Sequence, residues 1–143
     1  MRAVGLDLGT RRIGVAVSDS GGIMATPYSV IERSGDPEVD RKRVAEVVAE
    51  VGAEAVVVGL PLSMDGTVGP AATAASAEAA ALRQLLAVPV ELQDERLTSV
   101  TANRSLAAAG VTGRRRSRAA RQAGAVDSTA AAILLQSWLD GRK

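Results

Sequence analysis

Residues 5–19, GLDLGTRRIGVAVSD, decide the fold, because they contain two apolar runs joined by a connection that is too short for a helix. The first run covers residues 3–8 and the second covers residues 13–17, and Gly9-Thr10-Arg11-Arg12 lies between them. A connection of this length is typical of a hairpin between antiparallel strands. The chain therefore opens with two paired strands, and the first of them carries an acid, Asp7.

Further strand and helix signals follow this hairpin. Residues 23–31 predict a third strand, in which Pro27 is tolerated if that strand lies at the sheet edge. A helix begins after the capping acid Asp36 and ends at Gly52. Residues 55–58 form a short β-branched run, which indicates a strand buried on both faces.

Strand and helix signals also alternate in the second half of the chain. It predicts, in order, an irregular loop (60–69), an alanine-rich helix (about 70–86), a fifth strand (88–92), a helix from Thr98 or Ser99 to residue 110, a basic loop (112–118) and a final helix (about 119–139). Gly124 is a point at which the final helix could bend or restart.

These elements predict the α/β fold class. The expected sheet is mixed and five-stranded, with a three-stranded antiparallel meander plus two parallel strands, and helices flank it. A chain of 143 residues, 47% of them hydrophobic, can bury one compact core. We expect a single domain over residues 1–143.

The composition excludes several kinds of catalytic site. The chain has no cysteine and no histidine, so thiolate zinc sites, histidine-activated nucleophiles and imidazole bases are ruled out. Asp7 and Arg11 interrupt the N-terminal apolar run, and no apolar stretch approaches the roughly 20 residues that a membrane span needs. We therefore expect a cytoplasmic protein with no membrane partner.

Asp7 is the first candidate site residue. Its neighbours Leu6 and Leu8 are apolar, and a carboxylate is costly in such a strand unless it is paired or binds a cation. The structural alternative is that Asp7 accepts hydrogen bonds or pairs with Arg11 or Arg12.

The tripeptide Asp94-Glu95-Arg96 is the second candidate. Neighbouring residues of a strand point to opposite faces, so only one of these two acids can point with Asp7. Alternation alone does not say which one. The structural alternative is an ordinary acidic strand end in which Arg96 pairs locally.

Asp127 is the third candidate. It shares a helical stripe with Ala131, Leu134 and Trp138, which places an acid on the face meant for the core. The alternative is that Gly124 breaks the helix and Asp127 caps its continuation.

The positions of these three acids, which come from distant segments, are explained together if their carboxylate oxygens bind divalent cations. Oxygen ligands of this kind favour Mg²⁺ or Mn²⁺ over zinc. Two such ions about 4 Å apart activate a water and stabilise the leaving oxygen of a phosphodiester, so no histidine base is needed. The absence of histidine is thus compatible with hydrolysis.

Arginines cluster beside the third acid. The net charge is only +1, but the loop at residues 114–118 is rich in arginine and leads into the helix of Asp127. A cationic clamp for a phosphate backbone would stand there; the alternative is a solvated, mobile loop. We assign nucleic-acid binding to Arg11, Arg12, Arg96, Arg114, Arg115, Arg116, Arg118 and Arg121.

Four motifs resemble the YqgF family, also called RuvX, whose members are described as candidate pre-16S rRNA nucleases or Holliday-junction resolvases. The motifs are GLDLGTRRIGVAVSD (5–19), VVVGLPLSMDGT (56–67), DERLTS (94–99) and VDSTAAAILLQSWL (126–139). The resemblance implies a bacterial, cytoplasmic protein with an RNase H-like fold. It makes Asp7, Glu95 and Asp127 the metal-binding, catalytic acids, and it leaves Asp94 as a neighbour.

The resemblance also implies a function. It suggests a nuclease that uses Mg²⁺ or Mn²⁺, as two ions, to mature the 5′ end of pre-16S rRNA in ribosome biogenesis. The alternative substrate is branched four-way DNA in recombination and repair, for which a homodimer would match the symmetric junction. In the related RuvC resolvases the second acid follows the strand that matches residues 55–58, whereas this chain has Gly59-Leu60-Pro61 there. Its second acid must come from the next strand.

Two other classes of function remain open. Residues 7–10, DLGT, also resemble the phosphate loop of actin and sugar-kinase ATPases, but those proteins close two lobes around ATP and this chain supplies one. Saturable ATP binding would support that class. In a non-catalytic RNA-binding module the arginines bind and the acids only satisfy the structure, and cutting that is lost in Asp7→Asn would exclude it.

Overall fold

A computed structural model describes residues 1–97 and 123–142 of the chain, although the side chains of residue 97 and residues 123–127 are not part of that description. The predicted helix from Thr98 or Ser99 to residue 110, the basic loop at 112–118 and the first residues of the final helix lie outside the described residues. The same holds for Arg114, Arg115, Arg116, Arg118 and Arg121.

The sheet is mixed and has five strands in the order β3-β2-β1-β4-β5. Strand β1 pairs antiparallel with β2 and parallel with β4, while β2–β3 is antiparallel and β4–β5 is parallel. The predicted meander and the two parallel strands are therefore confirmed. The strands are β1 (Ala3–Leu8), β2 (Arg12–Ser18), β3 (Ala25–Glu32), β4 (Ala55–Leu60) and β5 (Val90–Asp94).

Two strands start later than the sequence predicts. Strand β3 starts at Ala25 rather than residue 23, because the Asp19 carboxylate accepts the amides of Ile23 and Met24 and holds them in the preceding turn. Strand β5 covers residues 90–94 rather than 88–92, and it starts directly after Pro89, which has no amide hydrogen to donate to a ladder. The shift places Asp94 in the sheet.

Three α-helices and a short 3₁₀ helix accompany the sheet in the described part of the chain. Helix α1 starts after Asp36, whose carboxylate accepts the Glu38 amide, and it ends at Gly52 as predicted. The described part of helix α5 starts at Ala123, and the residues before it lie outside the description, so the bend or restart expected at Gly124 stays a prediction. The helices are α1 (Pro37–Val51), α2 (Pro70–Leu85), η1 (Glu95–Leu97) and α5 (Ala123–Gly141).

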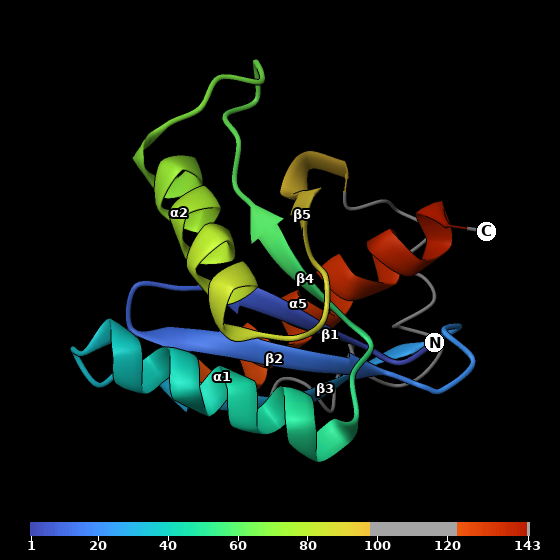
Figure 1. Ribbon diagram of the computed structural model, residues 1–143. Helices are drawn as coiled ribbons and strands as arrows, with labels where there is room; N and C mark the ends of the chain where they lie inside the picture. The colour runs from blue at the N-terminus through green and yellow to red at the C-terminus, as the bar shows by residue number, and fades with distance from the viewer. Residues whose placement is uncertain (98–122, 143) are drawn as a thin grey trace.

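The helices form two layers around the sheet. Helices α1 and α2 lie on one face, and α5 crosses the opposite face behind β1 and β2 (Figure 1). Val4, Leu6 and Val58 belong to the core beneath α1 and α2, whereas Ala3 and Val57 pack with Leu135 in the core beneath α5. No helix that the structure describes has the length and apolar character needed to span a bilayer.

Helix α5 lies unusually close to β1 at Gly5. A Cβ atom at this position would stand 2.8 Å from Leu135 Cβ and 3.1 Å from the Ala131 carbonyl oxygen. Because neither atom is the end of a flexible chain, any side chain at position 5 would push α5 away from the sheet. Gly5 therefore sets the distance between the helix of Asp127 and the strand of Asp7.

Gly5→Ala should lower the free energy of unfolding by about 1–3 kcal/mol, since overpacking of a dense core has costs of that order. Urea denaturation measures this change. Gly141→Ala is the matched control, because nothing lies within 4 Å of a Cβ at position 141. Equal stability of the two variants would contradict the close approach of α5.

Candidate functional site

The candidate site lies at the carboxyl ends of the three parallel strands β1, β4 and β5. Asp7 lies near the end of β1, Gly59 near the end of β4, and Glu95 directly after β5. All three occupy odd positions, on the α5 side of the sheet: Ala3 and Val57 pack against α5, and Gln93 contacts Ser137 of that helix. This parity explains why Glu95, and not Asp94, points with Asp7.

The Asp7 and Glu95 side chains are hydrogen-bonded to each other. Burial, followed by the negative charge of Asp7 and this hydrogen bond, raises the pKa of the Glu95 carboxyl to about 7. Two carboxyl groups in such close contact cannot both ionise without strong repulsion, so Glu95 retains a proton near neutral pH. A divalent cation between their oxygens would remove this repulsion, and oxygen-only donors suit Mg²⁺ or Mn²⁺.

Gly59 provides the room for the Glu95 side chain. A Cβ at position 59 would lie 3.0 Å from Glu95 Oε1 and 3.0 Å from Leu134 Cδ2. The Glu95 carboxyl thus passes over the backbone of β4 on its way to Asp7. The expected departure from the RuvC pattern has a geometric explanation, because the acid of the next strand occupies the space above a glycine.

A pocket of about 440 Å³ opens at this acid pair. Asp7 and Glu95 line it together with the turn after β1 and with the first half of α2, which contributes alanines and Glu78. Arg41 of α1 binds the Glu78 carboxylate through two nitrogens, at 2.9 and 3.1 Å. Glu78 is therefore committed to an ion pair that joins the two helices.

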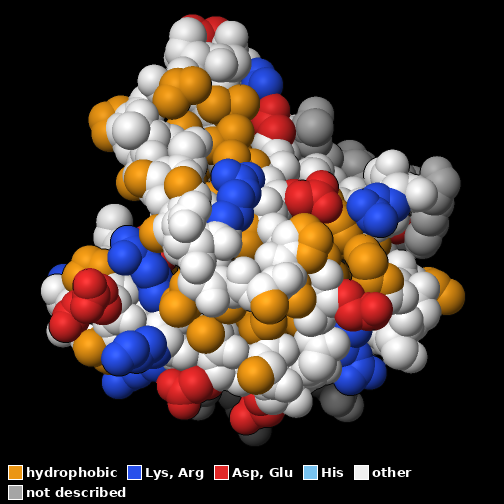
Figure 2. Space-filling view, viewed as in Figure 1, with side chains coloured by type: hydrophobic (Ala, Val, Ile, Leu, Met, Phe, Trp, Pro, Cys, Tyr) orange, Lys and Arg blue, Asp and Glu red, His pale blue; other side chains and the backbone are white. Residues whose placement is uncertain are grey.

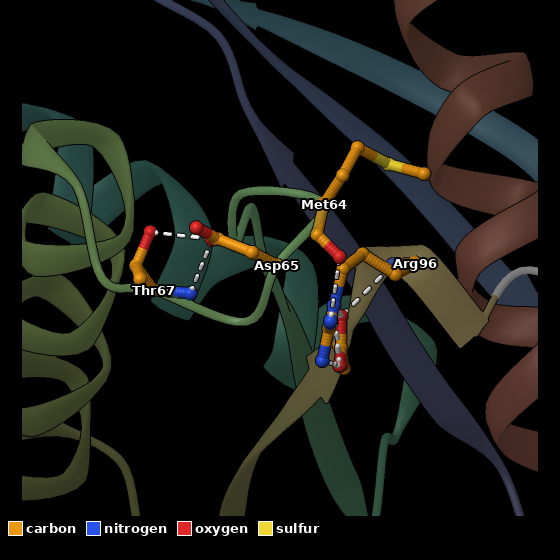
Figure 3. Close-up of polar contacts among 5 residues, drawn as sticks. Met64, Asp65, Thr67 and Arg96 are labelled. Carbon is orange, nitrogen blue, oxygen red and sulfur yellow. Dashed lines mark hydrogen bonds and ion pairs between the residues drawn. The ribbon is translucent and has the colours of Figure 1, made fainter.

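Asp94 and Arg96 form a separate pair beside the site. Arg96 Nη2 lies 2.7 Å from Asp94 Oδ2, and Arg96 Nη1 donates to the Met64 carbonyl oxygen at 3.3 Å (Figure 3). The Arg96 guanidinium lowers the pKa of Asp94, chiefly through this hydrogen bond. The local pairing of Arg96 is confirmed, and it holds the loop between β4 and α2 near the end of β5.

The other predicted cations lie next to the turn between β1 and β2. Arg12 pairs with Glu32 at 2.9 Å rather than with Asp7, and Arg11 is exposed. Sequence reasoning missed Arg33, whose Nε donates to the Gly9 carbonyl oxygen at 2.7 Å and which lines the pocket of the acid pair. The strand pattern could have indicated Arg33, since a third strand antiparallel to the second would bring residue 33 beside Arg11.

Asp127 lies within α5, but its side chain is not among those that the structure describes. The other members of its predicted stripe, Ala131, Leu134 and Trp138, are all buried. The described residues contain no group of three acids that could hold a metal ion. The structure thus brings together Asp7 and Glu95, and the role of Asp127 stays a prediction.

The raised pKa of Glu95 makes a prediction about stability in metal-free protein. The folded state keeps the Glu95 proton up to about pH 7, whereas the unfolded chain loses it near the ordinary glutamate value of about 4.3. The folded state therefore binds more protons between these values, and the free energy of unfolding should fall as pH rises through that window.

Urea denaturation in EDTA between pH 4.5 and pH 8 measures this fall, which should be smaller in Glu95→Gln. Glu91→Gln, at an exposed position of β5, should behave as the wild type. A Glu95→Gln profile that parallels the wild type would contradict the assignment.

Gly59→Ala should separate the two carboxyl groups, because the added methyl would lie 3.0 Å from Glu95 Oε1. With Asp7 further away and the side chain more hydrated, the pKa of Glu95 should decrease toward its ordinary value. Carbon-13 NMR titration of labelled glutamate carboxyls measures this change. Gly69→Ala, with nothing within 4 Å of its Cβ, is the control, and an unchanged titration in Gly59→Ala would refute the contact.

The chain is similar to known proteins along nearly its whole length. Residues 1–141 match the family model described as "RuvX: Holliday junction resolvase". A protein of Mycobacterium sp. (strain KMS) is 45% identical over 143 residues, which cover 99% of this chain and 81% of that protein. A protein of Anaeromyxobacter dehalogenans (strain 2CP-C) is 46% identical over 142 residues, covering 99% and 98%. Both are named as candidate nucleases for pre-16S rRNA.

The fold also resembles a solved structure. RuvC of T. thermophilus in complex with a Holliday junction substrate superposes with a TM-score of 0.63 at 19% identity, covering 99% of this chain and 96% of that one. The likeness shows the RuvC-like RNase H fold that the motifs predict. Because the family model matches nearly the whole of this chain, the chain belongs to the RuvX (YqgF) family.

Proposed function

We propose that this protein is a metal-dependent nuclease that hydrolyses phosphodiester bonds in the maturation of the 5′ end of pre-16S rRNA. The observation that carries the proposal is the contact of the Asp7 and Glu95 carboxyls inside an open pocket. Close pairs of acids of this kind are costly to a fold and are typical of active sites. The names of relatives at 45–46% identity supply the substrate.

In the proposed site, Asp7 and Glu95 would bind Mg²⁺ or Mn²⁺, and Asp127 would be the third ligand. Asp127 fits this role because its helix covers the face toward which Asp7 and Glu95 point, and because it falls on the stripe of Ala131 and Leu134. The bound ions would supply an activated water and charge stabilisation at the leaving oxygen.

The remaining parts of the site orient these acids. Gly59 leaves the space in which the Glu95 carboxyl reaches Asp7, and Leu134 closes that space from the α5 side. The Glu95 proton must leave before both acids can bind a cation, so cation binding and deprotonation are coupled. Arginines at the turn after β1 and in the segment at residues 114–121 would bind the phosphate backbone.

Cutting assays test the proposal. Purified protein with Mn²⁺ or Mg²⁺ should cut a 5′-extended 16S rRNA transcript, and Asp7→Asn, Glu95→Gln and Asp127→Asn should each reduce the rate about 100-fold or more while keeping most of the binding. Removal of the metal with EDTA should also stop cutting.

Two control variants sharpen the result. Glu91→Gln, at an exposed position of β5, should cut as the wild type does, and Asp94→Asn should lose much less activity than Glu95→Gln because Asp94 pairs with Arg96. Undiminished cutting in Asp7→Asn would contradict the proposed function. Full cutting in Asp127→Asn would contradict only the assignment of Asp127 as the third ligand.

Four-way DNA is the second candidate substrate. The family description and the RuvC-like fold favour it, whereas the names of the relatives favour RNA. A side-by-side assay of the 16S precursor and a four-way junction, with the same enzyme and metal, separates them. Faster cutting of the junction at equal concentration would favour resolution over rRNA maturation.

A further inference from the structure

We propose that Arg33 binds a phosphate of the substrate strand beside the acid pair, and that the strand leaves the site over the turn between β1 and β2. This inference rests on the proposed nuclease function and adds the route of the substrate. It concerns a residue that lies outside the sequence motifs and outside the predicted basic loop.

The first observation is the position of Arg33. Its Nε donates to the Gly9 carbonyl oxygen at 2.7 Å, and its backbone amide donates to the Arg11 carbonyl oxygen at 2.9 Å. Gly9 is two residues beyond Asp7, at most about 7 Å along the chain. The guanidinium is therefore held next to the acid pair by the same turn that ends β1.

The second observation is the charge of the pocket. Three of its lining residues are acids, Asp7, Glu78 and Glu95, and among the described residues that line it Arg33 is the cation. Arg41, from outside this lining, binds Glu78. Phosphodiester substrates carry negative charge to a site made of acids, so a cation at the rim is needed to hold the strand.

The third observation is a continuous path. A second pocket, of about 520 Å³, shares Thr10 and Arg33 with the first. Its charged lining also includes Arg11, Arg12 and two acids, the buried Asp40 and Glu32, which pairs with Arg12. Figure 2 shows Lys and Arg side chains on the left of this face, with Asp and Glu side chains among them, around the turn between β1 and β2 and the start of α1. A strand that leaves the acid pair over Thr10 meets these cations in sequence.

The guanidinium also has a structural neighbour. Asp40 is buried, and its pKa is lowered first by the hydrogen bond from the Ser34 amide and then, more weakly, by the charges of Arg33 and Arg43. Within the described residues Arg33 forms no ion pair with Asp40, and it donates hydrogen bonds through Nε and the backbone amide. The terminal nitrogens are suited to a bidentate phosphate contact.

The experiment compares Arg33→Ala with Arg83→Ala. Arg83 is the matched control because its Nε also donates to a backbone carbonyl, that of Val90 at 2.9 Å, at the opposite end of β5 from the site. Binding of the 16S precursor transcript is measured from 50 to 300 mM KCl, in an Asp7→Asn background that prevents cutting. Cutting is measured in the otherwise unchanged protein.

Arg33→Ala should weaken binding severalfold and reduce the slope of log affinity against log salt by about 0.7–0.9, the value of one phosphate contact. In cutting assays KM should rise more than kcat falls. The Mn²⁺ concentration at half-maximal rate should not change, since Arg33 does not touch the metal ligands. Arg33→Lys, which keeps the charge, should restore most of the salt slope.

A salt slope in Arg33→Ala equal to that of Arg83→Ala would overturn the inference while leaving the nuclease function intact. A slope lost equally in Arg33→Ala and Arg33→Lys would also overturn it, because the effect would then come from the turn at Gly9 rather than from charge. A wild-type protein that cuts neither RNA nor junction DNA would contradict the proposed function, and the inference with it.

Discussion

The contact between the Asp7 and Glu95 carboxyls is the constraint on which the rest of the site depends. Burial, followed by the charge of Asp7 and its hydrogen bond, raises the pKa of Glu95 to about 7, and a fold gains nothing from the repulsion between two acids by itself. The surrounding structure must hold them in place. Strand register aligns the ends of β1 and β4, β5 continues to Asp94, and the turn into η1 places Glu95 over Gly59. The acid pair is thus a product of the whole sheet.

Helix α5 is the second support. Its approach to β1 at Gly5 and to β4 at Gly59 requires two glycines on the same face of the sheet. The helix can lie this close because residues such as Ala131 and Ala132 are small and buried. The same packing brings the position of Asp127 to the side of the sheet that carries the acid pair, which is why the proposed third ligand comes from a helix.

Much of this could be predicted from the sequence, and the reasons are physical. The hairpin and the buried strand at residues 55–58 were recognisable from apolar runs, and Asp7 was recognisable because an acid is costly there. The choice between Asp94 and Glu95 was not, since alternation says that the two acids face opposite sides of the sheet, whereas the side that each one takes depends on the pairing of β5 with β4 and on the packing of α5. Arg33 was missed because its importance arises from pairing between strands, not from a local motif.

The position of Gly59 bears on how the acids of such sites change in evolution. The resemblance to the RuvC resolvases implies an acid after the strand at residues 55–58, where this chain has Gly59. In three dimensions, however, the carboxyl of Glu95 stands directly above that glycine, at a spacing that excludes even a methyl group without displacement. The space above this glycine is thus filled by a carboxyl from the neighbouring strand. An acid at position 59 and one at position 95 would therefore compete for the same space, so an exchange between these two arrangements by single substitutions must pass through a chain that has neither of them.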